Sequence, residues 1–310
     1  MRTPRKGASR KRTRRYNAGL PELRKDPITG RWVIIATGRA QRPSDFSRES
    51  VPPPTRGGFC PFCYGNESKT PPEILAYRQD GQANTPGWSL RVVPSKFPAL
   101  RVEGELNRQG EGMFDRMNGI GAHEVIIESP EHESTMSELP DKQVKEVLWA
   151  LRSRVLDLRQ DRRLRFAVLF KNHGVTAGAT LQHSHSQLIA LPVIPKRVRE
   201  EIDGAKAYFD YKERCIYCDM VHQETQATVR LILETDRFVV LSPYAARFPF
   251  ETWIVPRRHE SHFEESEATT VENLAWVLRE TLRKMDKVLE RPAYNFMIHT
   301  APIQEGHLAH

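Results

Sequence analysis

The stretch GATLQHSHSQLIALP, residues 178–192, places two histidines and a glutamine at alternate positions and continues as an apolar run. Alternate residues of a β-strand share one face, so the pattern predicts a strand with His183, His185 and Gln187 on the same side. Same-face neighbours lie roughly 6–7 Å apart, because each residue of a strand rises by ~3.3 Å. One metal ion could therefore bind one of these histidines and leave the other beside it.

All four cysteines of the chain occur in two Cys-x-x-Cys pairs, Cys60 with Cys63 and Cys215 with Cys218. In a cytosolic protein such pairs indicate metal or redox chemistry rather than structural disulfides. The first pair follows the loop VPPPTRGGF instead of opening a helix after a strand, which favours metal binding over a redox role. Sulfur ligands favour zinc and argue against magnesium.

The two cysteine pairs head two similar passages, which indicates a duplicated unit. In both passages a strand-like run leads to Phe-Pro, then to a glutamate, an apolar strand and a histidine. The interval from Glu124 to His132 is eight residues, and so is the interval from Glu251 to His259. Each copy therefore offers two cysteines and one histidine to a metal.

Zinc prefers four ligands, so each set needs one more residue. The candidates in the first half are three histidines: His173, His183 and His185. In the second half, His310 follows His259 by the same 51 residues that separate His183 from His132, and His307 is the competing candidate. The sequence thus predicts one zinc site and allows a second.

The coarse elements predict an α+β fold built from two duplicated halves, each a mostly antiparallel sheet with a long helix. Apolar residues recur at helical intervals within 139–161 and 268–290, and Asp141 is the expected start of the first helix. Short β-rich runs include RWVIIAT, HEVIIES, RFAVLFKNHG and AYNFMIHTAP. We expect an N-terminal tail over 1–20, a first half over 21–196 and a second half over 197–310.

The basic charge of the protein is concentrated at its N-terminus. Residues 1–15 hold eight of the 47 Lys and Arg residues and no acid, so the rest of the chain is balanced against 39 acidic residues. Such a block predicts a disordered tail, and charge alone reads neither a nucleic-acid sequence nor a lipid. With no apolar run of ~18 residues and no signal peptide, we expect a soluble, cytoplasmic protein.

Taken together, these motifs resemble the galactose-1-phosphate uridylyltransferase family, the transferase branch of the histidine-triad superfamily. Four segments carry the resemblance: DPITGRWVIIATGRAQRP from residue 26, CPFC from residue 60, SPEH from residue 129 and KNHGVTAGATLQHSHSQ from residue 171. They follow the order of the family's motifs, and the similarity covers roughly residues 22–310.

The resemblance implies a role for each residue of the alternating motif. His183 would be the fourth zinc ligand beside Cys60, Cys63 and His132, His185 the nucleophile, and Gln187 a hydrogen-bond donor to the phosphoryl oxygens. The implied phosphate contacts are Arg39, Arg42, Asn172 and Thr180. Serine is common in the family where Thr180 stands, and the hydroxyl is kept.

The implied reaction is nucleotidyl transfer by double displacement, in which a histidine carries the nucleotide between two sugar phosphates. The main hypothesis is a UDP-glucose:hexose-1-phosphate uridylyltransferase of galactose metabolism, with a UDP-sugar and a hexose 1-phosphate as substrates. The first alternative is an ADP-sugar phosphorylase or adenylyltransferase with the same nucleophile. A more distant alternative is a zinc-stabilised nucleic-acid-binding module that uses the basic tail.

Two further expectations come from the family alone. Relatives are commonly homodimers with the active site near the interface. They also continue beyond the position of His310 with a strand and a helical tail that contributes to sugar-phosphate binding. The resemblance therefore implies a second half that is truncated at its end and lacks part of the acceptor site.

Overall fold

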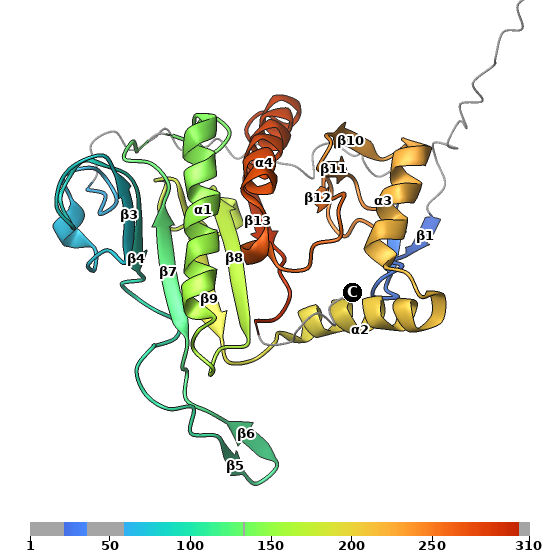
Figure 1. Cartoon of the computed structure of the whole chain (residues 1–310), viewed down its shortest axis with the longest axis horizontal. Coiled ribbons are helices and arrows are strands. Elements are labelled where there is room, and N and C mark those ends of the chain that lie inside the picture. Colours follow the sequence, from blue (N-terminus) through green and yellow to red (C-terminus); the bar gives the residue numbers. More distant parts are fainter. Residues whose placement is uncertain (1–21, 36–58, 133, 304–310) are drawn as a thin grey trace, which may run out of the picture.

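A six-stranded antiparallel sheet forms the centre of the computed structural model, which describes residues 22–35, 59–132 and 134–303 (Figure 1). The strand order is β13-β8-β9-β7-β4-β3. In chain order these strands are β3 (Leu75–Arg78), β4 (Trp88–Pro94), β7 (Ala122–Ile127), β8 (Phe166–His173), β9 (His185–Leu191) and β13 (Tyr294–Ile298). The predicted strand of histidines is β9, an inner strand paired with β7 and β8. It begins at His185, so the prediction is wrong for His183, which lies in a bend just before the strand.

The two predicted long helices are α1 (Asp141–Leu158) and α4 (Ala268–Leu289), which pack side by side (Figure 1). The apolar positions that predicted α1 are all buried: Val144, Val147, Leu148, Leu151, Val155 and Leu158. They share one hydrophobic core with residues of α4 and with the inward-facing residues of the sheet. Helix α1 begins at Asp141, as expected.

The second half resembles the first in its order of strands followed by a long helix and further β structure, with three strands before its helix and one described strand after it. Its three-stranded sheet consists of β10 (Leu231–Glu234), β11 (Phe238–Leu241) and β12 (Trp253–Pro256). Two further helices, α2 (Lys196–Lys212) and α3 (Ile216–Ala227), precede it, and the sequence pattern did not predict them. The prediction of an α+β fold with two related halves is confirmed.

Strand β13 belongs to the second half but pairs with β8 of the first half. The register places Asn295 opposite Asn172 and Ile298 opposite Leu169. Side chains from both halves therefore lie next to one another on this sheet. The sequence pattern did not reveal this pairing.

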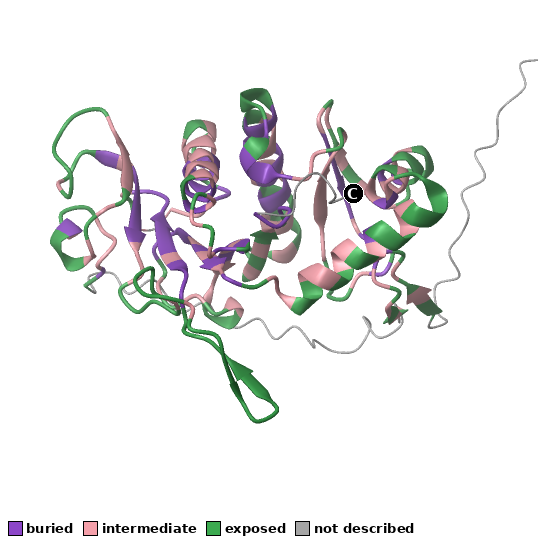
Figure 2. Ribbon diagram, turned by 60° about the horizontal axis from the view of Figure 1, so that its bottom comes forward, coloured by how far each residue is buried: buried purple, intermediate pink, exposed green. Residues whose placement is uncertain are grey.

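Smaller elements lie at the edges of the molecule. Strands β1 (Glu22–Lys25) and β2 (Trp32–Ile35) form one hairpin, and β5 (Gln109–Glu111) and β6 (Phe114–Arg116) form another that projects from the body and is fully exposed (Figure 2). Short 3-10 helices are η2 (Glu67–Lys69), η3 (Val175–Ala177) and η4 (Phe263–Glu265). Among the described helices, none combines the length and apolarity needed to cross a bilayer.

The two faces of the central sheet differ in their environment. Leu169 and Leu188 point into the core with α1 and α4 and are completely buried. Because alternate residues face opposite sides, Gln187 lies on the face turned away from these helices. The alternation of β9 thus assigns one face to folding and leaves the other for chemistry.

We expect Leu169→Ala to lower the free energy of unfolding by about 2–5 kcal/mol, because it opens a cavity in a closely packed core. The matched control is Met297→Ala on the neighbouring strand β13, where the side chain is 57% exposed. That change should stay within about 0.5 kcal/mol of the unaltered protein. Urea unfolding followed by circular dichroism measures both, and equal losses would contradict the assignment of the two faces.

Candidate active site and metal centre

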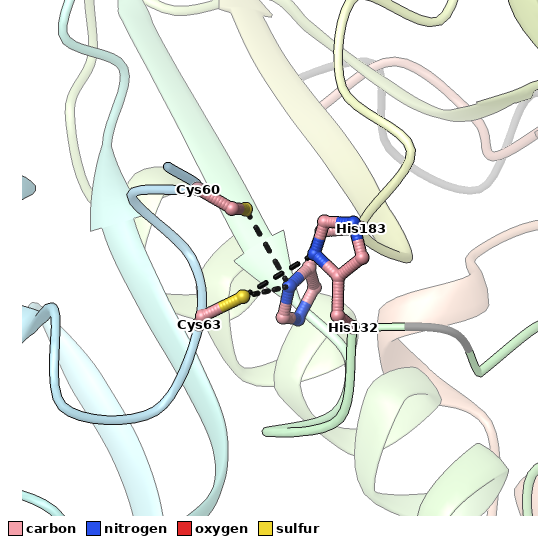
Figure 3. Close-up of side chains that lie close together, drawn as sticks. All are labelled: Cys60, Cys63, His132 and His183. Carbon is pink, nitrogen blue, oxygen red and sulfur yellow. Dashed lines mark hydrogen bonds between the residues drawn. The ribbon is translucent and has the colours of Figure 1, made fainter. Parts of the chain in front are cut away.

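Four side chains from separate parts of the first half meet in one cluster (Figure 3). Cys60 and Cys63 come from the loop before η2, His132 from the turn after β7, and His183 from the residues just before β9. The Cys63 sulfur lies 3.2 Å from Nδ1 of His132, and both sulfurs lie 3.7 Å from Nδ1 of His183. A tetrahedral zinc ion would separate sulfur and nitrogen ligands by about 3.6 Å. The cluster therefore has the composition and size of a metal site.

The hydrogen bonds of His183 suit a metal ligand. Its Nε2–H donates to the carbonyl oxygen of Ser129 at 2.7 Å, which leaves Nδ1 without a proton and turned toward the sulfurs. Burial lowers the pKa of His183 to about 4, so the ring is neutral near pH 7. Burial and the adjacent Cys60 raise the pKa of Cys63 to about 11. Metal binding would therefore release a proton from this thiol.

Hydrogen bonds outside the cluster hold the cysteine loop in place. Glu67 is buried and accepts hydrogen bonds from the indole N–H of Trp88 at 2.7 Å and the backbone N–H of Gly65 at 3.1 Å. The side-chain amide of Asn66 donates to the carbonyl oxygen of Cys60 at 2.8 Å. The two cysteines are thus presented by a loop that is anchored to strand β4.

The second histidine of the motif uses its ring nitrogens the other way round. The Nδ1–H of His185 donates to the carbonyl oxygen of His183 at 2.7 Å, so the lone pair remains on Nε2. Burial lowers the pKa of His185, and the positive charge of Lys171 lowers it further. A neutral imidazole with an unprotonated Nε2 has the form that a nucleophile requires.

Two side-chain amides lie on the same face of the sheet as His185. The oxygen of Gln187 lies 3.0 Å from Nε2 of His123, and the oxygen of Asn172 accepts a hydrogen bond of 2.6 Å from Asn295. Phe170 pairs with Gln187, and the alternation of β8 places Asn172 on that face as well. Of the three predicted phosphate-contacting or stabilising side chains that the structure describes, it thus brings two, Gln187 and Asn172, onto the face of His185.

The opposite face of the motif is tied to a buried carboxylate. Glu128 and Lys171 are almost completely buried and form an ion pair of 2.7 Å. The hydroxyls of Ser184 and Ser186 both donate to Glu128, and Lys171 also donates to the carbonyl oxygen of His185 at 3.1 Å. Burial raises the pKa of Glu128, but Lys171 and the two serines together hold that pKa below its ordinary value. The carboxylate is therefore charged, and it fixes both serines that flank His185.

Of the three other predicted phosphate contacts, the structure describes only Thr180. Thr180 lies in the loop between η3 and β9 and is exposed. Arg39 and Arg42, like the basic tail, lie outside the described residues. Their roles remain predictions.

Comparison with known families agrees with this geometry. The family model of the galactose-1-phosphate uridyl transferase N-terminal domain matches residues 11–195, and that of the C-terminal domain matches residues 201–310. This chain belongs to the galactose-1-phosphate uridylyltransferase family.

Within this family the chain is similar to proteins with two different names. An ADP-glucose phosphorylase from Arabidopsis thaliana is 38% identical over 287 residues, which cover 92% of this chain and 79% of the relative. A galactose-1-phosphate uridylyltransferase from Thermotoga maritima is 28% identical over 293 residues, which cover 94% and 84%. The crystal structure of an ADP-glucose phosphorylase from Arabidopsis thaliana with bound ADP-glucose matches with a TM-score of 0.78 at 37% identity, covering 94% of this chain and 86% of that one. A transferase-type activity on nucleotide sugars and sugar phosphates is therefore supported.

A second group of potential metal ligands lies in the other half of this family member. Cys215, Cys218 and His259 have ligand atoms within 4.8 Å of one another, and the Cys218 sulfur lies 3.5 Å from Nδ1 of His259. The predicted fourth ligand His310 and its competitor His307 lie outside the described residues. This second site stays a prediction.

Sequence reasoning missed four residues of the site: His123, Glu128, Lys171 and Asn295. A signal was present for two of them, because Glu128 and Lys171 are charged residues that directly follow the apolar runs 125–127 and 166–170. The serines of the motif were interpreted only as spacers that keep the strand alternation, whereas both donate to Glu128. Finding that partner required the three-dimensional pairing of β7 with β9.

We expect Lys171→Met to lower the free energy of unfolding by about 3–5 kcal/mol, because it leaves Glu128 buried without its counter-charge. The double variant Glu128→Gln with Lys171→Met should recover much of that loss, since neither remaining group is charged. Urea unfolding measures both variants. A single variant as stable as the unaltered protein would show that the pair does not hold this strand.

Proposed function

We propose that this protein transfers a nucleotidyl group by double displacement through His185, with an ADP-sugar as donor and inorganic phosphate as acceptor. The observation that carries the proposal is the hydrogen bond from Nδ1–H of His185 to the carbonyl oxygen of His183, which leaves Nε2 as the attacking atom. The similarity to the ADP-glucose phosphorylase favours the adenylyl group over the uridylyl group.

In the first step, Nε2 of His185 attacks the α-phosphorus of the ADP-sugar. The bond from the α-phosphorus to the bridging oxygen breaks, sugar 1-phosphate leaves, and adenylyl-histidine remains. In the second step, an oxygen of inorganic phosphate attacks the same phosphorus, the phosphorus–nitrogen bond breaks, and ADP is released. Forming the covalent intermediate divides one difficult transfer into two easier ones and gives ping-pong kinetics.

The leaving group in the first step is already a phosphate, so a dedicated general acid is less necessary than stabilisation of charge on the phosphoryl oxygens. Gln187 and Asn172 can supply amide N–H donors from the sheet. Arg39 and Arg42 are the predicted charged donors, and Thr180 is a predicted hydroxyl donor. Charge-assisted hydrogen bonds from the arginines would be the strongest of these contacts.

Zinc is the proposed occupant of the first cluster, where Cys60, Cys63, His132 and His183 would hold it. Such a four-ligand site keeps no open position for substrate, so the ion would supply structural support rather than reactivity. An ion at this place would fix His183, which lies just before β9 and two positions before His185. Zinc at Cys215, Cys218 and His259 is proposed on the chemistry of the ligands alone.

The main alternative is uridylyl transfer from UDP-glucose to a hexose 1-phosphate, which the sequence pattern placed first. The family models and the relative from Thermotoga maritima support it. The nucleophile and the intermediate would be the same in both reactions, because only the base and the acceptor differ. A cytoplasmic location and a homodimer remain predictions.

We expect ADP-glucose labelled with ³²P at the α-phosphorus to leave acid-labile label on the protein, and labelled UDP-glucose to leave far less. His185→Ala should abolish the labelling, and the exposed His222→Ala on α3 is the matched control. Preferential labelling by UDP-glucose would support uridylyl transfer instead. Labelling by neither donor in a folded protein would overturn the proposal.

We expect elemental analysis of the purified protein to find about two zinc ions per chain, one in each cysteine cluster. Cys60→Ser should lose one ion, because serine is a much poorer zinc ligand than a thiolate, and it should also lower the melting temperature. Cys215→Ser should lose the other ion. If the protein holds a single zinc ion that only Cys60→Ser removes, then zinc binds at the first site and not at the second.

A further inference from the structure

The two amides near His185, Gln187 and Asn172, could each present either an oxygen or an NH₂ group to a phosphate. Only the NH₂ group donates hydrogen bonds, so the orientation of each amide decides whether it stabilises or repels a phosphoryl oxygen. In both cases a neighbouring side chain determines the orientation, and that side chain is itself fixed by a backbone group. The two series of hydrogen bonds are independent of one another.

The first series of hydrogen bonds fixes the amide orientation of Gln187 through His123. The backbone N–H of Ala99 can only donate, and it donates to Nδ1 of His123 at 3.2 Å. Nδ1 therefore carries no proton, and the neutral ring has its proton on Nε2. Nε2–H lies 3.0 Å from Oε1 of Gln187, so it donates to that oxygen. The amide NH₂ of Gln187 is left to point elsewhere.

The position of His123 on the sheet explains this contact. Gln187 pairs with Val125 of β7, and His123 stands two residues earlier on the same face of β7. Diagonal neighbours in an antiparallel pair are within reach of a long or aromatic side chain. The contact thus follows from the register of β7 and β9.

The second series of hydrogen bonds fixes the amide orientation of Asn172 through Asn295. The carbonyl oxygen of Ala177 can only accept, and it lies 2.8 Å from Nδ2 of Asn295. That atom is therefore the NH₂ group, and it also donates to Oδ1 of Asn172 at 2.6 Å. The NH₂ group of Asn172 takes no part in these hydrogen bonds. Asn295 stands directly opposite Asn172 in the pairing of β13 with β8.

We infer that His123 and Asn295 are positioning residues that hold the amides of Gln187 and Asn172 with their NH₂ groups directed at the phosphoryl oxygens of a nucleotide bound at His185. This inference rests on the proposed transfer through His185. Within the described part of the chain, neither NH₂ group has a protein partner. Donors that are oriented before the substrate arrives need no rearrangement as charge develops in the transition state.

The kinetic test uses His123→Phe and Asn295→Asp. The first keeps a ring but removes the N–H, and the second keeps the shape but replaces the NH₂ by an oxygen that would turn the Asn172 amide around. We expect each to slow formation of the nucleotidyl-enzyme by about 10–100-fold with KM changed less than about threefold, below the ~10²–10³-fold cost of removing an oriented donor outright. His123→Gln, whose amide can donate to Gln187, should recover most of the rate.

A double-variant cycle separates positioning from a general structural effect. If His123 acts through Gln187, then His123→Phe should cost little further rate in a Gln187→Ala background. The same holds for Asn295→Asp in an Asn172→Ala background. Equal losses with and without the amide, or no loss in the single variants, would overturn the inference.

A measurement that does not depend on activity is the tautomer of His123, read from the ¹⁵N chemical shifts of its ring. We expect the proton on Nε2. A proton on Nδ1 would contradict the series of hydrogen bonds that fixes the amide orientation of Gln187. Failure of the unaltered protein to form any nucleotidyl-enzyme would remove the proposed function and this role with it. Normal labelling with unaffected variants would remove only the role of His123 and Asn295.

Discussion

The buried carboxylate of Glu128 is the group on which the reactive strand depends. It lies directly after β7, is fully removed from solvent, and accepts hydrogen bonds from Lys171, Ser184 and Ser186. An isolated charge in this position would strongly destabilise the fold, so the carboxylate and its three donors must be in place together. Because the two serines alternate with the two histidines, fixing one face of the segment fixes the other. Lys171 adds a direct hydrogen bond to the backbone of His185.

The two histidines differ because the protein binds opposite nitrogens of their rings. His183 donates from Nε2 to Ser129 and presents Nδ1 to the cysteines, while His185 donates from Nδ1 and keeps Nε2 available. Their alternate positions in the sequence alone do not distinguish the two residues. The carbonyl of Ser129, after β7, and the carbonyl of His183, just before β9, make the distinction. One motif can therefore supply both an anchor for a metal and a nucleophile.

The second half of the chain also contributes directly to the sheet of the first. Strand β13 lies against β8, which brings Asn295 next to Asn172. The helix that precedes it, α4, shares the hydrophobic core with α1. The duplication thus supplies parts to one site as well as a second copy of the fold.

Local patterns predicted what depends on local sequence. The sequence predicts the periodicity of α1, the alternation of β9 and the spacing of the cysteine and histidine residues. The ion pair of Glu128 with Lys171 was not, because its partners are 43 residues apart and meet only through strand pairing. Helix α2 gave no clear pattern, since Ala205 is its only buried residue. Which nitrogen each histidine uses depends on backbone carbonyls that no sequence pattern places.

The most direct test of this account is to determine which atom carries the nucleotide. Protein labelled with ¹⁵N in its histidine rings would be allowed to react with ADP-glucose and studied by phosphorus–nitrogen coupling in NMR, with the modified residue located by mass spectrometry. The account predicts phosphorus bonded to Nε2 of His185. Phosphorus on Nδ1, or on any other residue, would contradict it.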